Sequence, residues 1–284
     1  MLYNGCAGGE AMLFDCHTHS TNSDGKNTVE EMCASSLENA LDGVMITDHA
    51  DMNFYNERNT YSRIQNSIRD IQEAQEKYSG SLKVFKGIEL GEYTISPQKA
   101  EEVLSLNCFD AVLCSIHFVP QAGWSLAYNR IDFHTAMPSE AEINEYLKLY
   151  FDLLSETVDA FDFDVLAHIH CPARYITGKY GRKSNVMLFE DKISEILEKI
   201  VKRNIALELN TLYIKDQDGK YNFSLDKILG MYKQLGGRMV TLGSDAHNKA
   251  DVGRNFQQAA QLLKEQGFDR AYYYENRKPV SYPL

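Results

Sequence analysis

Short apolar runs alternate with longer amphipathic segments along most of this chain. The runs are rich in Val, Ile and Leu, which is typical of strands buried in a parallel sheet. The first begins at Met12, and the others occupy residues 44–47, 84–88, 111–116, 164–167, 205–210 and 239–243. Segments with apolar residues near helical spacing follow them at residues 28–41, 61–78, 97–106, 139–160, 187–203, 225–235 and 256–265. The pattern therefore predicts seven strand-helix units.

Seven such units indicate an α/β protein with a parallel sheet. Since the sequence has no glycine-rich dinucleotide loop, we prefer a closed or nearly closed barrel to an open, doubly wound sheet. We expect a single domain over residues 12–284, preceded by a glycine-rich extension over residues 1–11. In a barrel of this kind the carboxyl ends of all strands meet on one face, where catalytic residues lie.

Three segments depart from the repeat. Residues 118–138 carry the only Trp, Trp124, and lack periodicity, so we interpret them as an active-site loop or lid. Residues 171–184 form a basic stretch that we expect to be irregular, and residues 271–274 are a candidate edge strand.

Composition narrows the class of protein. The chain has 284 residues, 44% hydrophobic content and a net charge of -11, which favours an enzyme for small molecules over a nucleic-acid binder. The six cysteines are scattered without a CxxC pair, which predicts reduced thiols. No membrane-length apolar run and no signal-peptide pattern is evident, so we expect a cytoplasmic protein that binds neither nucleic acid nor membrane.

Residues that bind metals gather at the ends of the predicted strands. His17 and His19 are two positions apart, so on a strand both imidazoles point to the same side. Six of the eight histidines lie at such ends, which would be unexpected for scattered solvated residues. Nitrogen and carboxylate ligands together suit zinc, iron or manganese. The full candidate set is His17, His19, Asp24, His49, Glu89, His117, His168, Asp245 and His247.

The phrases DCHTHSTNSDG, ITDHAD, GIELG, CSIHFV, DVLAHIH, LELNT and GSDAH resemble the ordered motifs of the polymerase and histidinol phosphatase (PHP) family. The resemblance covers the chain from Met12 to the tail, and within the family it is greatest to the histidinol-phosphate phosphatase branch. It implies a distorted, TIM-like (β/α)7 barrel that binds two or three divalent metals and hydrolyses phosphate esters.

Carried over by position, the resemblance implies three metal sites and a metal-bridging hydroxide held by Glu89. The first metal would lie on His17, His19, Glu89 and Asp245, the second on Glu89, His117 and His168, and the third on Asp24, His49 and His247. In this account Glu89 bridges the first two metals.

The sequence departs from the branch near the expected substrate. His170 stands where an aspartate is more usual, and Leu212-Tyr213 replace a small Ser-Gly pair after LELNT. Arg174 can form a fork with two phosphate oxygens or can be a solvated loop residue. Asn210 faces the same end and can bind substrate or satisfy a loop backbone. We expect Arg174, His170 and Asn210 to contact the substrate.

Asp15, Asp48 and Glu92 are candidates for orienting the ligand imidazoles. Equally, Asp15 can cap a turn and Asp48 can hold a loop.

These observations predict a phosphomonoesterase that converts L-histidinol phosphate into L-histidinol and inorganic phosphate in histidine biosynthesis. One alternative is a related phosphatase for another small phosphoester or for protein phosphotyrosine. Another is a replication- or repair-associated nuclease, or an inert metal-binding module, which the acidic charge disfavours.

Overall fold

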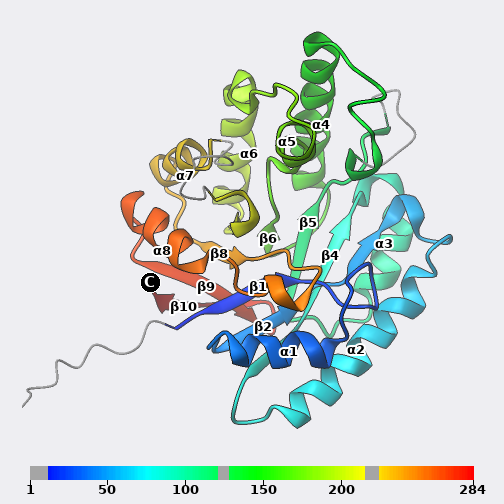
Figure 1. The fold of residues 1–284 in the computed structure, drawn as a ribbon, viewed down its shortest axis with the longest axis vertical. Coiled ribbons are helices and arrows are strands. Elements are labelled where there is room, and N and C mark those ends of the chain that lie inside the picture. The colour runs from blue at the N-terminus through cyan, green and yellow to red at the C-terminus, as the bar shows by residue number, and fades with distance from the viewer. Residues whose placement is uncertain (1–11, 121–127, 215–223) are drawn as a thin grey trace, which may run out of the picture.

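A parallel barrel forms the centre of the protein, and helices surround it (Figure 1). The computed structural model describes residues 12–120, 128–214 and 224–284. Hydrogen-bonded strands follow the order β1-β2-β4-β5-β6-β7-β8, and every pairing along this path is parallel. The strands are β1 (Phe14–Thr18), β2 (Gly43–Ile46), β4 (Lys83–Gly91), β5 (Ala111–Ser115), β6 (Val165–Leu166), β7 (Ala206–Asn210) and β8 (Val240–Gly243). The predicted single-domain α/β barrel is confirmed.

The first and last barrel strands meet along a short seam. An isolated parallel bridge joins Thr18 to Ala246. The Asp245 amide donates to the carbonyl of His17 at 2.8 Å, and the His19 amide donates to the carbonyl of Ala246 at 2.9 Å. The barrel therefore closes between β1 and the residues directly after β8.

The outer helices bury one apolar face each. In α6, Ile193, Ile196, Leu197 and Ile200 are buried at i, i+3, i+4 and i+7 spacing. Capping boxes begin two other helices, since the Thr28 and Ser139 side chains each accept from the backbone three residues on. The helices are α1 (Val29–Glu38), α2 (Thr60–Lys77), α3 (Pro97–Leu104), α4 (Glu140–Ala160), α5 (Cys171–Ala173), α6 (Glu190–Lys202), α7 (Leu225–Gln234) and α8 (Phe256–Glu265).

A hairpin packs at the amino-terminal end of β1. Strands β9 (Arg270–Glu275) and β10 (Lys278–Pro283) pair antiparallel in a sheet of their own. The ring of Phe14 stacks on Tyr273 at 4.2 Å and lies 5.0 Å from Tyr282. The edge strand expected at 271–274 is therefore half of this hairpin.

Two further details differ from the sequence-based expectation. A short strand, β3 (His49–Asp51), continues alongside β4 where we expected only a polar turn. The stretch from Cys171, expected to be irregular, begins with α5 and continues as a wide helical turn over Arg174–Lys179. The predictions for residues 1–11 and for Trp124 lie outside the described residues. None of the described helices is long and apolar enough to span a membrane.

Candidate metal centre

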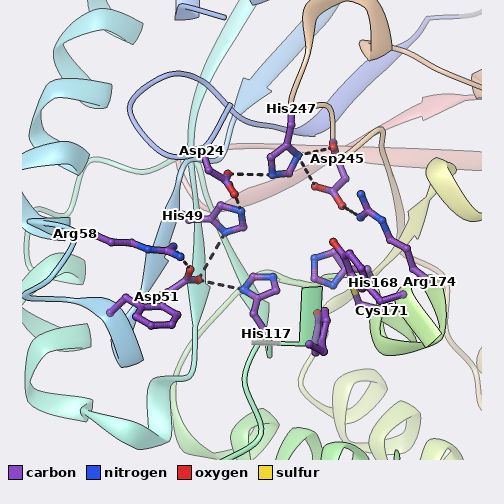
Figure 2. A pocket seen from close by; sticks show the side chains of 13 residues that line it. Asp24, His49, Asp51, Arg58, His117, His168, Cys171, Arg174, Asp245 and His247 are labelled. Atoms are coloured by element: carbon purple, nitrogen blue, oxygen red, sulfur yellow. Dashed lines mark hydrogen bonds and ion pairs between the residues drawn. The ribbon is translucent and has the colours of Figure 1, made fainter. Parts of the chain in front are cut away.

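The nine predicted ligand residues converge on the carboxyl ends of the barrel strands, and most line the pocket shown in Figure 2. Parallel strands carry their carboxyl ends to one face, so residues far apart in sequence meet there. His17, His49 and Glu89 lie within β1, β3 and β4, whereas the other ligand candidates lie in the segments directly after strands. The structure brings the whole predicted set together.

Glu89 is at the centre of this cluster and is fully buried. Its Oε1 faces two imidazoles, lying 2.7 Å from His168 Nε2 and 3.2 Å from His117 Nε2. Its Oε2 faces a different set, lying 2.9 Å from His49 Nδ1, 3.3 Å from His17 Nε2 and 3.5 Å from His19 Nε2. The two carboxylate oxygens thus serve two separate groups of nitrogen donors.

A second carboxylate, Asp24, organises the outer part of the cluster. Asp24 Oδ1 lies 3.0 Å from His247 Nε2 and 3.3 Å from His49 Nε2. Together with His19, these residues place ligand atoms within 4.8 Å of one another. His49 therefore stands between Asp24 and Glu89, with one ring nitrogen toward each.

Asp245 connects the cluster to an arginine. Its backbone is left-handed, with φ of 53°, a conformation that Asp tolerates better than most residues. Oδ1 lies 3.2 Å from His19 Nε2, while Oδ2 accepts a hydrogen bond from Arg174 at 2.7 Å. Burial alone would raise the pKa of Asp245, but Arg174 and the neighbouring histidines hold it well below its usual range. The carboxylate is therefore ionised.

Donors and acceptors in this cluster do not alternate as they would in a self-sufficient hydrogen-bond network. The Nε2 atoms of His17 and His19 face each other at 3.0 Å, so no more than one proton fits between them. Among the described residues, no donor makes a hydrogen bond of good geometry to Glu89 Oε2. Buried groups of this kind are satisfied by cations placed among them. The donor set fits divalent metal ions.

The protonation preferences support the same conclusion. Burial would lower the pKa of His49, yet the charges of Glu89 and Asp51 raise it to about 9. Burial also opposes the charged form of His168, but Cys171 and Glu89 raise its pKa to about 10. The anionic cluster attracts positive charge, which protons supply when metal ions do not.

Two carboxylates that we had not predicted contact ligand imidazoles from behind. Glu208 Oε1 lies 2.6 Å from His17 Nδ1, and Asp51 Oδ1 lies 3.1 Å from His117 Nδ1. Both residues occur in phrases quoted above, LELNT and ITDHAD, but neither phrase shows which imidazole the carboxylate meets.

The three residues predicted for this orienting role do other work. Asp15 accepts from the Ser244 amide and hydroxyl, and so caps the turn after β8. Asp48 accepts from Ser20, Ser23 and Ser67 hydroxyls and holds the loop after β1. Glu92 binds the backbone amides of His117 and Phe118. The capping alternatives for Asp15 and Asp48 are therefore confirmed.

The pocket over the cluster has an aromatic and cationic wall. Arg58 and Arg174 approach from opposite sides in Figure 2, and each pairs with a cluster carboxylate. Arg58 donates to Asp51 Oδ2 at 2.8 Å. The lining residues are Asp24, His49, Asp51, Phe54, Arg58, His117, Tyr128, His168, Cys171, Arg174, Tyr175, Asp245 and His247.

Two of the predicted substrate contacts are absent from this wall. Within the part of the chain that the structure describes, neither His170 nor Asn210 lines the pocket. His170 is buried, and the Asn210 side chain accepts from the Leu212 amide at 3.2 Å. Asn210 thus satisfies a loop backbone, the alternative role considered for it, because its strand ends directly beneath a tight turn. Arg174 does line the pocket.

Fold and site together define a class: parallel α/β barrels that hold a buried histidine-carboxylate metal centre at the carboxyl ends of their strands. A family model described as the PHP domain matches residues 15–212. The chain belongs to the PHP domain family.

Curated relatives match over nearly their whole length. A probable histidinol-phosphatase of Clostridium acetobutylicum is 30% identical over 261 residues, covering 89% of this chain and 93% of the relative. A probable histidinol-phosphatase of Thermotoga maritima is also 30% identical, covering 90% and 94%.

A solved structure shares the fold. It is a histidinol phosphate phosphatase of Lactococcus lactis, complexed with zinc, L-histidinol and phosphate. The TM-score is 0.76 at 23% identity, and the match covers 94% of this chain and 98% of that one.

Proposed function

We propose that this protein is a metal-dependent phosphomonoesterase that hydrolyses L-histidinol phosphate to L-histidinol and inorganic phosphate in histidine biosynthesis. The observation that carries the proposal is the buried cluster around Glu89, which opens into a pocket lined by Arg174. The relatives named as histidinol-phosphatases support the substrate, because the matches extend over about nine-tenths of both chains.

The cluster holds two or three zinc, iron or manganese ions. His17, His19, Glu89 and Asp245 supply the first group of donors, and Glu89, His117 and His168 supply the second. A third group consists of Asp24, His49 and His247, with His19 beside it. When bound, such ions offset the charge of the phosphate dianion and lower the pKa of a water molecule that then attacks phosphorus.

Glu89 prepares the site for this chemistry. Its two oxygens face different donor groups, so one buried carboxylate neutralises part of the charge of two cations. Because Glu89 is fully buried, bulk water does not screen that interaction. Its pKa is held well below the usual range, since the charges of His49, His117 and His17 outweigh the effect of burial. The carboxylate therefore remains an anion throughout the working pH range.

Arg174 binds the phosphoryl group. Its side chain is about 25% exposed at the pocket wall, and its NH1 is held by Asp245 at 2.7 Å. A planar guanidinium fixed by one nitrogen can direct its other N–H groups toward two phosphate oxygens. Phe54, Tyr128 and Tyr175 line the same pocket and limit the access of water. The phosphate is thus held between a cation of the chain and the metal centre.

A substrate panel tests the proposal. Protein reconstituted with zinc, iron or manganese is assayed on histidinol phosphate, phosphotyrosine, nucleotide phosphates and single-stranded DNA, with chelated protein as control. We expect kcat/KM to be highest for histidinol phosphate and activity to disappear on chelation. Preference for phosphotyrosine or for another small ester would replace the substrate, and preference for DNA would overturn the phosphomonoesterase assignment.

A further inference from the structure

Glu208 is a buried carboxylate on β7 that lies behind the cluster instead of facing the pocket. It is 3% exposed, and it is not one of the pocket-lining residues in the described chain. Its neighbours Leu207 and Leu209 are buried apolar residues, so it interrupts an otherwise apolar strand. Burying an ionised carboxylate costs several kcal/mol unless hydrogen bonds satisfy it. The partners of Glu208 therefore indicate why an acid stands at this position.

The two oxygens of Glu208 bind two different ligand-bearing segments. Oε1 lies 2.6 Å from Nδ1 of His17 on β1, and Oε2 accepts the backbone amide of His168 after β6 at 2.7 Å. His17 belongs to the first proposed donor group and His168 to the second. One side chain thus ties together the segments that carry both groups.

The ring geometry of His17 gives the contact a chemical consequence. An ionised carboxylate only accepts hydrogen bonds, so the proton of a neutral His17 ring must be on Nδ1. The other nitrogen, Nε2, then presents its lone pair toward Glu89 Oε2, 3.3 Å away. This is the tautomer that a metal ligand requires.

The opposite strand is adapted to the same contact. Gly243 on β8 lies beside both residues, and a Cβ at that position would overlap Glu208 Oε1 and the Cβ of His17. A side chain there would displace the carboxylate or the imidazole. Glycine at 243 therefore leaves room for the pair.

We propose that Glu208 is a positioning residue that fixes the Nδ1-protonated tautomer of His17 and anchors the His168 backbone, so that both nitrogens of the Glu89 cluster are preset for metal ions. This inference rests on the proposed function, because it treats His17 and His168 as ligands. It extends that function by assigning the residue that prepares them.

Glu208→Gln separates this role from simple packing, because the shape is kept while the hydrogen bonding changes. An amide has one accepting oxygen and one donating nitrogen. If its oxygen keeps the His168 amide, its nitrogen must donate to His17 Nδ1, which moves the His17 proton to Nε2. If the amide is reversed, its nitrogen instead faces the amide N–H of His168. Either way one of the two partners is lost.

The experiment measures zinc binding and tautomer state in the full chain. Zinc affinity is determined by competition with a chelator, and the ring nitrogens of His17 are assigned by 15N NMR in zinc-free protein. We expect Glu208→Gln to weaken zinc binding by roughly 10- to 100-fold and to shift His17 toward the Nε2-protonated form. Wild-type affinity together with an unchanged tautomer would overturn the proposal.

A matched control and a double-mutant cycle address a purely structural role. Asp164→Asn also removes a buried carboxylate that accepts a backbone amide, from Val112 at 2.7 Å, but Asp164 precedes β6 at the other end of the barrel. This control should leave zinc affinity unchanged. In a His17→Ala background, Glu208→Gln should cause much less additional loss, whereas full additivity would contradict action through His17.

Two arrangements keep the test decisive. Should Glu208→Gln fail to fold, Glu208→Asp keeps the charge but is one methylene too short to span both partners. We expect it to lose zinc affinity, and retention of wild-type affinity would count against the proposal. None of these measurements uses phosphatase activity, so an incorrect substrate assignment would leave the result interpretable.

Discussion

Phe14 and His17 lie three residues apart on β1 and face opposite ends of the same barrel. At the amino-terminal end, Phe14 is packed between Tyr273 and Tyr282 of the hairpin. At the carboxyl-terminal end, His17 lies against Glu89 and Glu208. Both side chains are 1% exposed or less, so burial is the same while the chemistry of the surroundings differs.

The difference shows how the barrel separates stability from chemistry. Burying a side chain such as Phe14 contributes about 1.5–3 kcal/mol to folding. Burying the carboxylates of Glu89, Asp245 and Glu208 instead carries a desolvation cost, which close partners must offset. Histidine protons or bound cations supply the compensating charge. The amino-terminal end therefore stabilises the fold whether or not the site is loaded.

The largest effect is expected from removing the charge of the central carboxylate. Glu89→Gln should lower metal content and reduce kcat/KM by about a thousandfold, because one oxygen of the pair can no longer offset a cation. Elemental analysis and steady-state kinetics on the same sample measure the two quantities. A fully loaded and fully active variant would remove Glu89 from the site.

A smaller effect is expected at the pocket wall. Arg174→Ala should leave metal stoichiometry intact and reduce kcat/KM by about a hundredfold, roughly 2.7 kcal/mol, through loss of phosphate binding. Arg174→Lys should recover only part of this, since it keeps the charge but lacks the planar fork. Inorganic phosphate should also inhibit the Ala variant more weakly. If both variants remain within about twofold of wild type, Arg174 does not bind the phosphate.

The smallest effect on function is expected at the amino-terminal end. Phe14→Leu should lower the free energy of unfolding by roughly 1 kcal/mol, because a smaller side chain packs less well against the two tyrosines. Metal content and kcat/KM at 25 °C should stay at the wild-type level. Chemical denaturation measures the first quantity, and a parallel loss of bound metal would show that the two ends of the barrel are coupled.

Local pattern was sufficient for most of the barrel. Helix starts at Thr28 and Ser139 are visible in sequence because a capping box is a three-residue signal. The convergence of His17, His49 and Glu89 could also be predicted, because parallel strands place their carboxyl ends together. Their role as metal ligands remains a prediction.

Features that depend on distant pairs could not be predicted. His17 and Glu208 are separated by 191 positions, and nothing near Glu208 indicates which imidazole it meets. The hairpin was missed for a local reason. Its turn places Asn276 and Arg277 at φ of 52° and 62°, whereas the usual signal for such a turn is Asn-Gly.

The seam between β1 and β8 has a mechanical consequence. His17 and His19 lie on one side of it and Asp245 and His247 on the other, and the seam itself has only a single bridge with a few backbone hydrogen bonds. Ions held across it would act as a removable cross-link between the two ends of the barrel. Such a link closes a very long loop, so it restricts the unfolded chain in the way that a disulfide does. Loading the centre with metal would therefore lock the barrel shut as well as equip it for catalysis.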